Sequence, residues 1–253
     1  MTKGKNIVGI IPVRMASTRF PGKPLAKICG LAMVEHIRRR VGLCKLLSRV
    51  IVATCDEEIK GLVEGFGGEA VMTSNTHERC TERVAEAAKD LDADIIVNIQ
   101  GDEPLVTPRM ITQVLGPMLE DKACGCVNLI CPIDDEEEFE SPNSVKTVVD
   151  QKGKVLYFSR EPIPSRKKTK EPFARYRQLG VIAFTKPVLF QYVAMPQTPL
   201  EKIESIDMMR LLENGYAVRA AVTDEPLYGV DTPLELKRVE ELMEKDRILR
   251  KYL

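Results

Sequence analysis

The sequence predicts an α/β protein with a mostly parallel sheet flanked by helices, and two observations carry that prediction. First, short apolar runs rich in Val and Ile alternate with amphipathic stretches of helical spacing through the first half of the chain. Second, polar loops follow the apolar runs Ile7–Pro12 and Asp94–Ile99, and the carboxyl ends of parallel strands are where sites of such sheets lie.

The first half of the chain is expected to alternate strand and helix. The predicted strands are Ile7–Pro12, Arg49–Thr54, Glu69–Met72 and Asp94–Ile99. The predicted helices are Leu31–Val41, a stretch that begins at Asp56 as N-cap, Thr81–Leu91 and Pro108–Leu119.

The second half changes character. Val145–Val149 and Val155–Phe158 flank a turn at Gly153, which predicts a hairpin. The acidic run Asp134–Glu138 indicates a solvated loop, and Ser165–Glu171 indicates a basic loop between prolines. Further strands are expected at Leu179–Phe184 and Ala217–Val222, and further helices at Leu200–Asn214, which ends at Gly215, and at Pro233–Leu249. Since no linker or repeat is visible, we expect a single domain over 1–253 with an antiparallel insertion near 135–185.

Composition excludes several classes of function. Lys plus Arg and Asp plus Glu both number 37, so no global field attracts nucleic acid. No apolar run approaches the roughly 18 residues of a membrane span. The N-terminus is typical of a first strand rather than a signal peptide, which favours the cytoplasm. Seven cysteines, an odd number, lie mostly in apolar segments and predict free thiols, and Cys124, Cys126 and Cys131 lack the partners of a zinc site.

The loop at 13–24 carries three positive charges, on Arg14, Arg19 and Lys23. Gly22 allows the backbone to approach a ligand closely, and Ser17 and Thr18 add hydroxyl groups. Such a loop suits a triphosphate, because charge-assisted hydrogen bonds to phosphate oxygens are strong. It is not a Walker A loop, since Pro24 stands where Ser or Thr would bind magnesium. The alternative is a solvated basic loop.

Two carboxylates stand at element ends. Asp102 follows a buried strand and a glycine, and Asp231 precedes a helix. Together they could share a magnesium ion bridged to phosphates. The alternatives are that Asp102 is a turn residue and that Asp231 is an N-cap before Thr232-Pro233.

Other kinds of catalysis find little support. His36 is expected to be structural, whereas His77 lies in a loop before a helix and could contact a ligand. No Gly-x-Ser-x-Gly elbow indicates a hydrolase, and no plausible histidine base accompanies a cysteine nucleophile. No Gly-x-Gly-x-x-Gly follows the first strand, which disfavours a dehydrogenase.

Five blocks of this sequence, in order along the chain, resemble the 3-deoxy-manno-octulosonate (KDO) cytidylyltransferases, the CMP-KDO synthetase family. The blocks are Ile10–Leu25, Val97–Leu105, Pro142–Lys146, Leu156–Pro164 and Gly229–Pro233. The resemblance implies a Rossmann-like nucleotidyltransferase fold in a homodimer. It also implies that CTP and a sugar acid give a CMP-sugar and pyrophosphate with Mg²⁺, for lipopolysaccharide-type glycan synthesis.

The resemblance also implies residue roles. The catalytic residues would be Arg14, Lys23, Asp102 and Asp231, of which Asp102 and Asp231 would hold Mg²⁺. The nucleotide would contact Arg14, Ser17, Thr18, Arg19, Lys23, His77, Thr81, Arg83 and Gln100. The sugar acid would contact Gln100, Arg160, Gln178, Ile182, Glu204 and Asp207.

Three departures from the family pattern open alternatives. The nucleotide-facing loop has Arg79-Cys80 where the family commonly has Ser-Gly, which bears on the preference for cytosine. On the sugar side Gln178 and Ile182 replace His and Tyr, and Met208 replaces Gln. Lost polar partners change discrimination between substrates. The acceptor could therefore be another acid, such as 8-amino-KDO or another surface-glycan component. A nucleotide-binding protein without turnover is a further alternative, disfavoured because all four catalytic residues are present.

Overall fold

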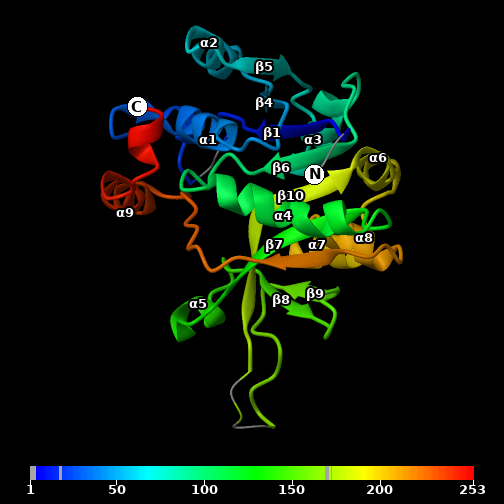
Figure 1. The fold of residues 1–253 in the computed structure, drawn as a ribbon. Coiled ribbons are helices and arrows are strands. Elements are labelled where there is room, and N and C mark those ends of the chain that lie inside the picture. The colour runs from blue at the N-terminus through cyan, green and yellow to red at the C-terminus, as the bar shows by residue number, and fades with distance from the viewer. Residues whose placement is uncertain (1–3, 17–18, 169–170, 172) are drawn as a thin grey trace. The chain divides into compact units, whose positions relative to one another are not determined.

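The computed structural model describes residues 4–16, 19–168, 171 and 173–253, and it divides into two compact units (Figure 1). The first unit comprises residues 1–112 and 227–253, and the second comprises residues 113–226. The antiparallel insertion expected near 135–185 therefore falls wholly within the second unit.

The first unit is built on parallel strands in the spatial order β6-β1-β4-β5. All six residues of β1 (Ile7–Pro12) are buried, and this strand pairs with β4 (Arg49–Thr54) and β6 (Ile95–Ile99). The strand β5 (Glu69–Met72) pairs with β4. The parallel arrangement confirms the prediction, because strands buried on both faces read as continuous Val and Ile runs.

Helices α1, α2 and α3 pack against these strands. The helices of this unit are α1 (Met33–Gly42), α2 (Glu57–Gly65), α3 (Cys80–Ala88) and α9 (Pro233–Glu244), with short 3₁₀ turns η1 (Lys23–Leu25) and η2 (Leu249–Lys251). The residues that start the predicted helix Leu31–Val41 instead form β3 (Leu31–Ala32), which pairs with β2 (Lys27–Ile28). The long helix α4 (Pro108–Glu120) begins in the first unit and ends in the second.

The second unit is mostly antiparallel. The strand β10 (Tyr176–Thr185) pairs antiparallel with β7 (Cys126–Pro132) and with β8 (Lys146–Val149). The predicted hairpin is confirmed, since β8 pairs antiparallel with β9 (Val155–Ser159) and Gly153 has a φ of 77°. The strand β11 (Arg219–Val222) runs parallel to β7. The helices are α5 (Glu136–Glu140), α6 (Lys186–Ala194), α7 (Pro199–Glu204) and α8 (Met209–Glu213).

Two predictions for this unit were wrong in their details. The acidic run at 134–138 is a loop only in its first two residues, because its last three begin α5. Asp135 caps α5, whose glutamates form ion pairs with Arg166, Arg175 and Arg177. The single helix expected at Leu200–Asn214 is two helices, because the backbone of Ser205 enters the left-handed region at a φ of 54°. Periodicity continues across that break, so the sequence alone did not reveal it.

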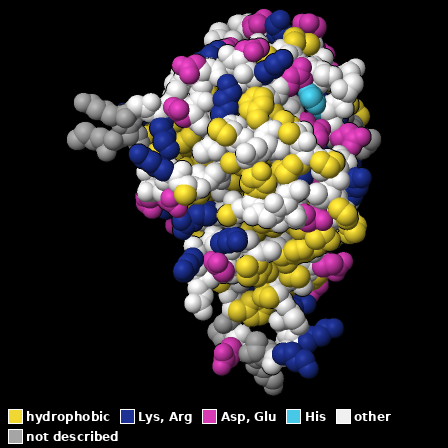
Figure 2. Space-filling model, turned by 90° about the vertical axis from the view of Figure 1, so that its right-hand side faces the viewer, with side chains coloured by type: hydrophobic (Ala, Val, Ile, Leu, Met, Phe, Trp, Pro, Cys, Tyr) yellow, Lys and Arg dark blue, Asp and Glu magenta, His cyan; other side chains and the backbone are white. Residues whose placement is uncertain are grey.

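The distribution of charged side chains and the state of the cysteines match what the composition predicts. Figure 2 shows basic and acidic side chains mixed over the face it presents, with no large area of one sign. In the part of the chain that the structure describes, no helix has both the length and the apolar character needed to cross a membrane. All seven cysteines lie among the described residues and none forms a disulfide, and Cys80 is exposed.

Candidate active site

Two hydrogen bonds hold the start of the basic loop in place where it leaves β1. The Val13 amide donates to the Ala53 carbonyl at 2.9 Å, and the Met15 amide donates to the Asp56 carboxylate at 2.8 Å. Asp56 stands at the N-cap position of α2 as predicted, but its side chain caps nothing there. Gly22, at a φ of 72°, turns the chain into η1, which carries Lys23. Ser17 and Thr18 lie outside the described residues.

Lys23 joins the two predicted carboxylates. Its Nζ lies 3.2 Å from Asp102 Oδ2 and 3.0 Å from Asp231 Oδ1, and Arg19 contacts the other oxygen of Asp231 at 3.0 Å. Burial alone would lower the pKa of Lys23, but Asp102 and Asp231 outweigh it, so the pKa is raised. Both carboxylates remain about a third exposed, so a ligand can reach them.

Backbone geometry explains how residues 129 positions apart in sequence meet. A side chain at Gly101 would collide with Val13 Cγ1 at 2.1 Å, so only glycine allows the turn after β6 to pass this close to β1. The Asp102 carbonyl then accepts the Val230 amide at 2.8 Å, which places Asp231 beside it.

The N-cap alternative for Asp231 is wrong. Thr232 caps α9, and it forms a capping box with Glu235. The Thr-x-x-Glu spacing was visible in the sequence and could have settled the point. The Asp231 carboxylate is thus left to Lys23 and Arg19.

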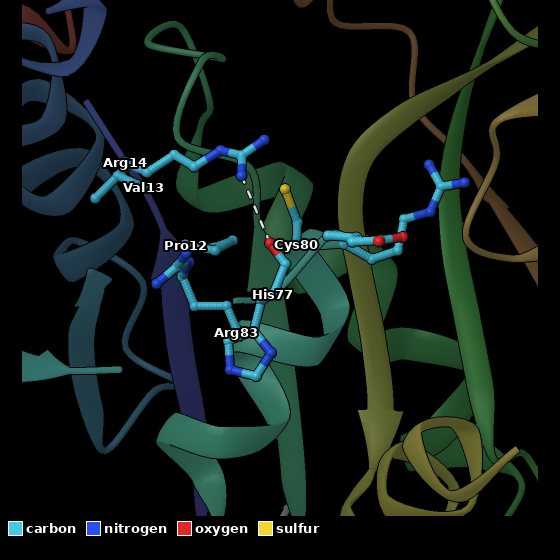
Figure 3. A pocket seen from close by; sticks show the side chains of 8 residues that line it. Pro12, Val13, Arg14, His77, Cys80 and Arg83 are labelled. Carbon is cyan, nitrogen blue, oxygen red and sulfur yellow. Dashed lines mark hydrogen bonds between the residues drawn. The ribbon is translucent and has the colours of Figure 1, made fainter. Parts of the chain in front are cut away.

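A pocket beside the basic loop gathers further cationic groups (Figure 3). Arg14 follows β1, and His77 comes from the segment that leads into α3. Cys80 is the first residue of α3, and Arg83 lies on the same helix. Arg14 Nη1 donates to the His77 carbonyl at 3.5 Å. Glu78 and Arg79 also line this pocket, so three arginines and one glutamate contribute to its lining. This excess of positive charge suits an anionic ligand.

The segment that lines the pocket is tied to α3 by Glu86, which the sequence analysis did not select. Its carboxylate accepts hydrogen bonds from the His77 ring and from the Ser74 amide. Burial alone would raise the pKa of Glu86, but these bonds lower it overall. Arg83 holds the same segment through Thr73 and Ser74. A histidine and a glutamate nine residues apart match no known sequence pattern, so only the fold reveals this contact.

Four described residues that were predicted to contact the nucleotide do not line this pocket. Two of them, Arg19 and Lys23, contact the carboxylates described above. Thr81 is fully buried in the first turn of α3, and Gln100 is half-buried just after β6. Their predicted roles stay predictions.

In the second unit, Arg160 and Glu204 are brought together. The Glu204 carboxylate accepts from the hydroxyl groups of Tyr157 and Ser159 and from the Arg160 amide. The Arg160 guanidinium donates to the carbonyls of Glu204 at 2.7 Å and Pro142 at 2.8 Å. In this structure it therefore binds backbone.

The other predicted sugar residues differ in access. Gln178 donates to Asn128 Oδ1 at 2.5 Å, and Asp207 is half-buried between α7 and α8. Ile182 and Met208 are buried, with exposures of 2% and 0%. Contacts between these residues and a sugar acid stay predictions.

The Asp102–Asp231 pair fits a magnesium ion. Its oxygens converge on one cation already, and hard carboxylate oxygens are the ligands that Mg²⁺ prefers. Among the described residues no group of three or more His, Cys, Asp or Glu could hold a metal. Two carboxylates are nevertheless sufficient, because Mg²⁺ commonly takes its remaining ligands from water and substrate phosphates.

Comparison with known proteins shows which family the chain belongs to. A family model described as Cytidylyltransferase matches residues 8–224. The 3-deoxy-manno-octulosonate cytidylyltransferase of Syntrophotalea carbinolica is 42% identical, over 93% of this chain and 97% of its own. That of Geotalea uraniireducens is 45% identical, over 94% and 99%.

A solved structure is also similar. It is a CMP:2-keto-3-deoxy-manno-octonic acid synthetase complexed with CTP, 36% identical, with a TM-score of 0.89 over 95% of this chain and 99% of that chain. The fold is therefore that of a Rossmann-like nucleotidyltransferase, as predicted. The chain is a nucleotidyltransferase that belongs to the 3-deoxy-manno-octulosonate cytidylyltransferase family.

Proposed function

We propose that this protein couples CTP to 3-deoxy-manno-octulosonate, giving CMP-KDO and pyrophosphate. The observation that carries the proposal is the convergence of Lys23, Arg19, Asp102 and Asp231 at the end of a basic loop. The relatives named for this reaction support it.

The chemistry asks the protein to position two anions and to neutralise developing charge. The anomeric oxygen of the sugar acid attacks the α-phosphorus and loses its proton, while the bond from the α-phosphorus to the bridging oxygen breaks and releases pyrophosphate. We assign Arg14, Arg19 and Lys23 to the triphosphate, because together they supply three cationic donors. This charge is most useful on the leaving pyrophosphate, where negative charge accumulates.

Asp102 and Asp231 would hold Mg²⁺. When bound there, Mg²⁺ would offset the negative charge of the triphosphate and make the acceptor hydroxyl more acidic. Lys23 contacts both carboxylates in this structure, so binding of phosphate by Lys23 would release them as ligands.

A related acceptor is the second candidate. Gln178 and Met208 replace the polar residues usual in the family, and a buried Ile182 replaces a tyrosine. A pocket that loses hydrogen-bonding groups discriminates differently between hydroxyl-bearing and amino-bearing substrates. This favours 8-amino-KDO or another surface-glycan acid as the alternative.

The test is pyrophosphate release with CTP and Mg²⁺ against KDO, 8-amino-KDO and a panel of sialic-type acids. Turnover with KDO at the highest kcat/KM supports the proposal. Turnover with another acid alone would move the protein to the second candidate, and CTP binding without release of pyrophosphate would leave a binding protein.

We further propose a cytoplasmic homodimer that serves lipopolysaccharide-type glycan synthesis. CTP is a cytoplasmic substrate, and the second unit exposes Leu156, Ile203 and Val222 by 50% or more, apolar side chains that a second copy would cover. Light scattering of the protein and of Ile203→Asp tests the dimer. A monomeric wild-type protein would contradict it.

A further inference from the structure

The C-terminal segment of the first unit meets the turn that carries Asp102 through one buried arginine. Arg40, on α1, is 1% exposed. Its Nε donates to the Val106 carbonyl at 2.7 Å, and its Nη2 donates to the Leu105 carbonyl at 3.2 Å. The same Nη2 lies 2.6 Å from a carboxylate oxygen of Asp246. One planar guanidinium therefore holds a turn and a distant carboxylate together.

These contacts connect the segment that follows Asp231 with the segment that follows Asp102. Asp231 precedes α9, α9 leads to Asp246, and Asp246 contacts Arg40. Arg40 holds Leu105 and Val106, three and four residues after Asp102. On the other side, the Asp102 carbonyl accepts the Val230 amide at 2.8 Å. The segments that carry Asp102 and Asp231 are therefore joined at two places, by the hydrogen bond from Val230 to Asp102 and through the Arg40 guanidinium.

We propose that Arg40 is a positioning residue that sets the spacing of Asp102 and Asp231 for nucleotidyl transfer. The inference rests on the proposed function and extends it to a residue that contacts neither substrate. A displacement of catalytic groups by about 1 Å can cost on the order of a hundredfold in rate, so a support of this kind has a measurable effect.

Arg39 provides a matched control. It lies on the same helix and also binds the C-terminal segment, through the Tyr252 carbonyl at 2.9 Å. Its other contacts are with Glu35 at 2.6 Å and the Phe66 ring at 5.1 Å. Arg39 therefore anchors the C-terminus as Arg40 does, but it does not hold the turn.

The experiment compares Arg40→Lys with Arg39→Lys in the full chain. The lysine ammonium cannot reproduce the fork that serves two carbonyls and a carboxylate. We expect Arg40→Lys to lower kcat by about tenfold or more, with the KM for the sugar acid unchanged. Arg39→Lys should keep kcat within about twofold at the same temperature, well below the midpoint of unfolding.

Hydrogen exchange supplies a readout that is independent of turnover. The Val230 amide donates to the Asp102 carbonyl, and the Val106 amide donates to the Glu103 carbonyl at 3.1 Å. In Arg40→Lys both amides should exchange about tenfold faster, while amides in β1 and β4 stay protected. Should this variant fail to fold, Asp246→Asn loosens the same guanidinium and should change both readouts in the same direction.

Normal protection of Val230 and Val106 in folded Arg40→Lys would overturn the proposal. So would faster exchange with unchanged kcat, or equal losses of kcat in Arg40→Lys and Arg39→Lys. If the wild-type protein releases no pyrophosphate from CTP, the proposed function fails separately, and the exchange measurement still decides whether Arg40 holds the turn.

Discussion

Two lysines, one in each unit, are held in opposite ways. Lys23 lies between the carboxylates of Asp102 and Asp231, and its pKa is raised. Lys146 is fully buried and donates to the carbonyls of Ser141, Ser144 and Arg160. Burial lowers the pKa of Lys146.

The difference separates a side chain that can exchange partners from one that holds the chain in place. The partners of Lys23 are side chains about a third exposed, which can turn toward a ligand. The partners of Lys146 are backbone carbonyls, which cannot leave without unfolding the hairpin end. Arg160 follows the same rule, since its guanidinium also binds carbonyls. Lys23 can therefore exchange its partners for a ligand, whereas Lys146 and Arg160 hold the backbone in place.

The largest expected effect is on turnover in Lys23→Met. Loss of a cation that stabilises developing charge should lower kcat by about 10²- to 10³-fold. The free energy of unfolding should change by less than about 1 kcal/mol, because its ion pairs are partly solvated. Pyrophosphate release and urea unfolding measure the two effects. Exposed Lys27→Met is the control, and retained turnover with lost stability would reverse the comparison.

Lys146→Met should lower stability and leave the kinetics unchanged, which is the opposite of Lys23→Met. Three carbonyls lose their donor, so the free energy of unfolding should fall by about 2 kcal/mol, partly offset because a buried charge is removed. The KM for CTP should be unchanged. Urea unfolding and steady-state kinetics check both. Unchanged stability would mean that the carbonyl contacts contribute nothing.

Measuring the free energy of unfolding at alkaline pH distinguishes Lys146 from Lys23 further. The folded pKa of Lys146 is below the ordinary value of 10.5, so its burial penalty shrinks as pH rises from the folded pKa toward 10.5. The wild-type protein should therefore gain stability relative to Lys146→Met over that range. The folded pKa of Lys23 is above 10.5, so its contribution is present below 10.5 and is lost only at higher pH.

A smaller effect is expected from Gln178→His on the acceptor side. The change restores the residue usual in the family and introduces a group that titrates near pH 6.5. The KM for KDO should change about three- to tenfold and become pH-dependent, while the KM for CTP stays constant. Initial rates at pH 6 and 8 check this. Exposed Gln191→His on α6 should change neither, and an equal response in both variants would remove Gln178 from the acceptor side.

The smallest effect is expected from Glu86→Gln. The pKa of Glu86 is below the ordinary 4.5, so its contribution to stability is present above pH 4.5 and is lost as pH falls through the folded pKa. The difference in melting temperature between wild type and Glu86→Gln should be largest near neutral pH and vanish in acid. A constant difference across pH would show that the His77–Glu86 pair contributes no charge-dependent stability.

Much of the first unit was predictable because its signals are local. The four parallel strands read as apolar runs, and Asp102 and Asp231 were recognised at element ends. Local signals failed where a partner distant in sequence decided the outcome. The Asp56 carboxylate accepts the Met15 amide instead of capping α2, and the left-handed backbone of Ser205 interrupts the helix expected at 200–214.

The sequence by itself determined the alternation of strand and helix, the basic loop, the two carboxylates and the family, because each is written in contiguous residues. Only the tertiary structure decided that Lys23 lies between Asp102 and Asp231, that Arg160 binds backbone, and that Arg40 holds the turn before α4. The physical reason is that side-chain partners and electrostatic shifts depend on distances across the fold, and residue spacing along the chain does not encode those distances.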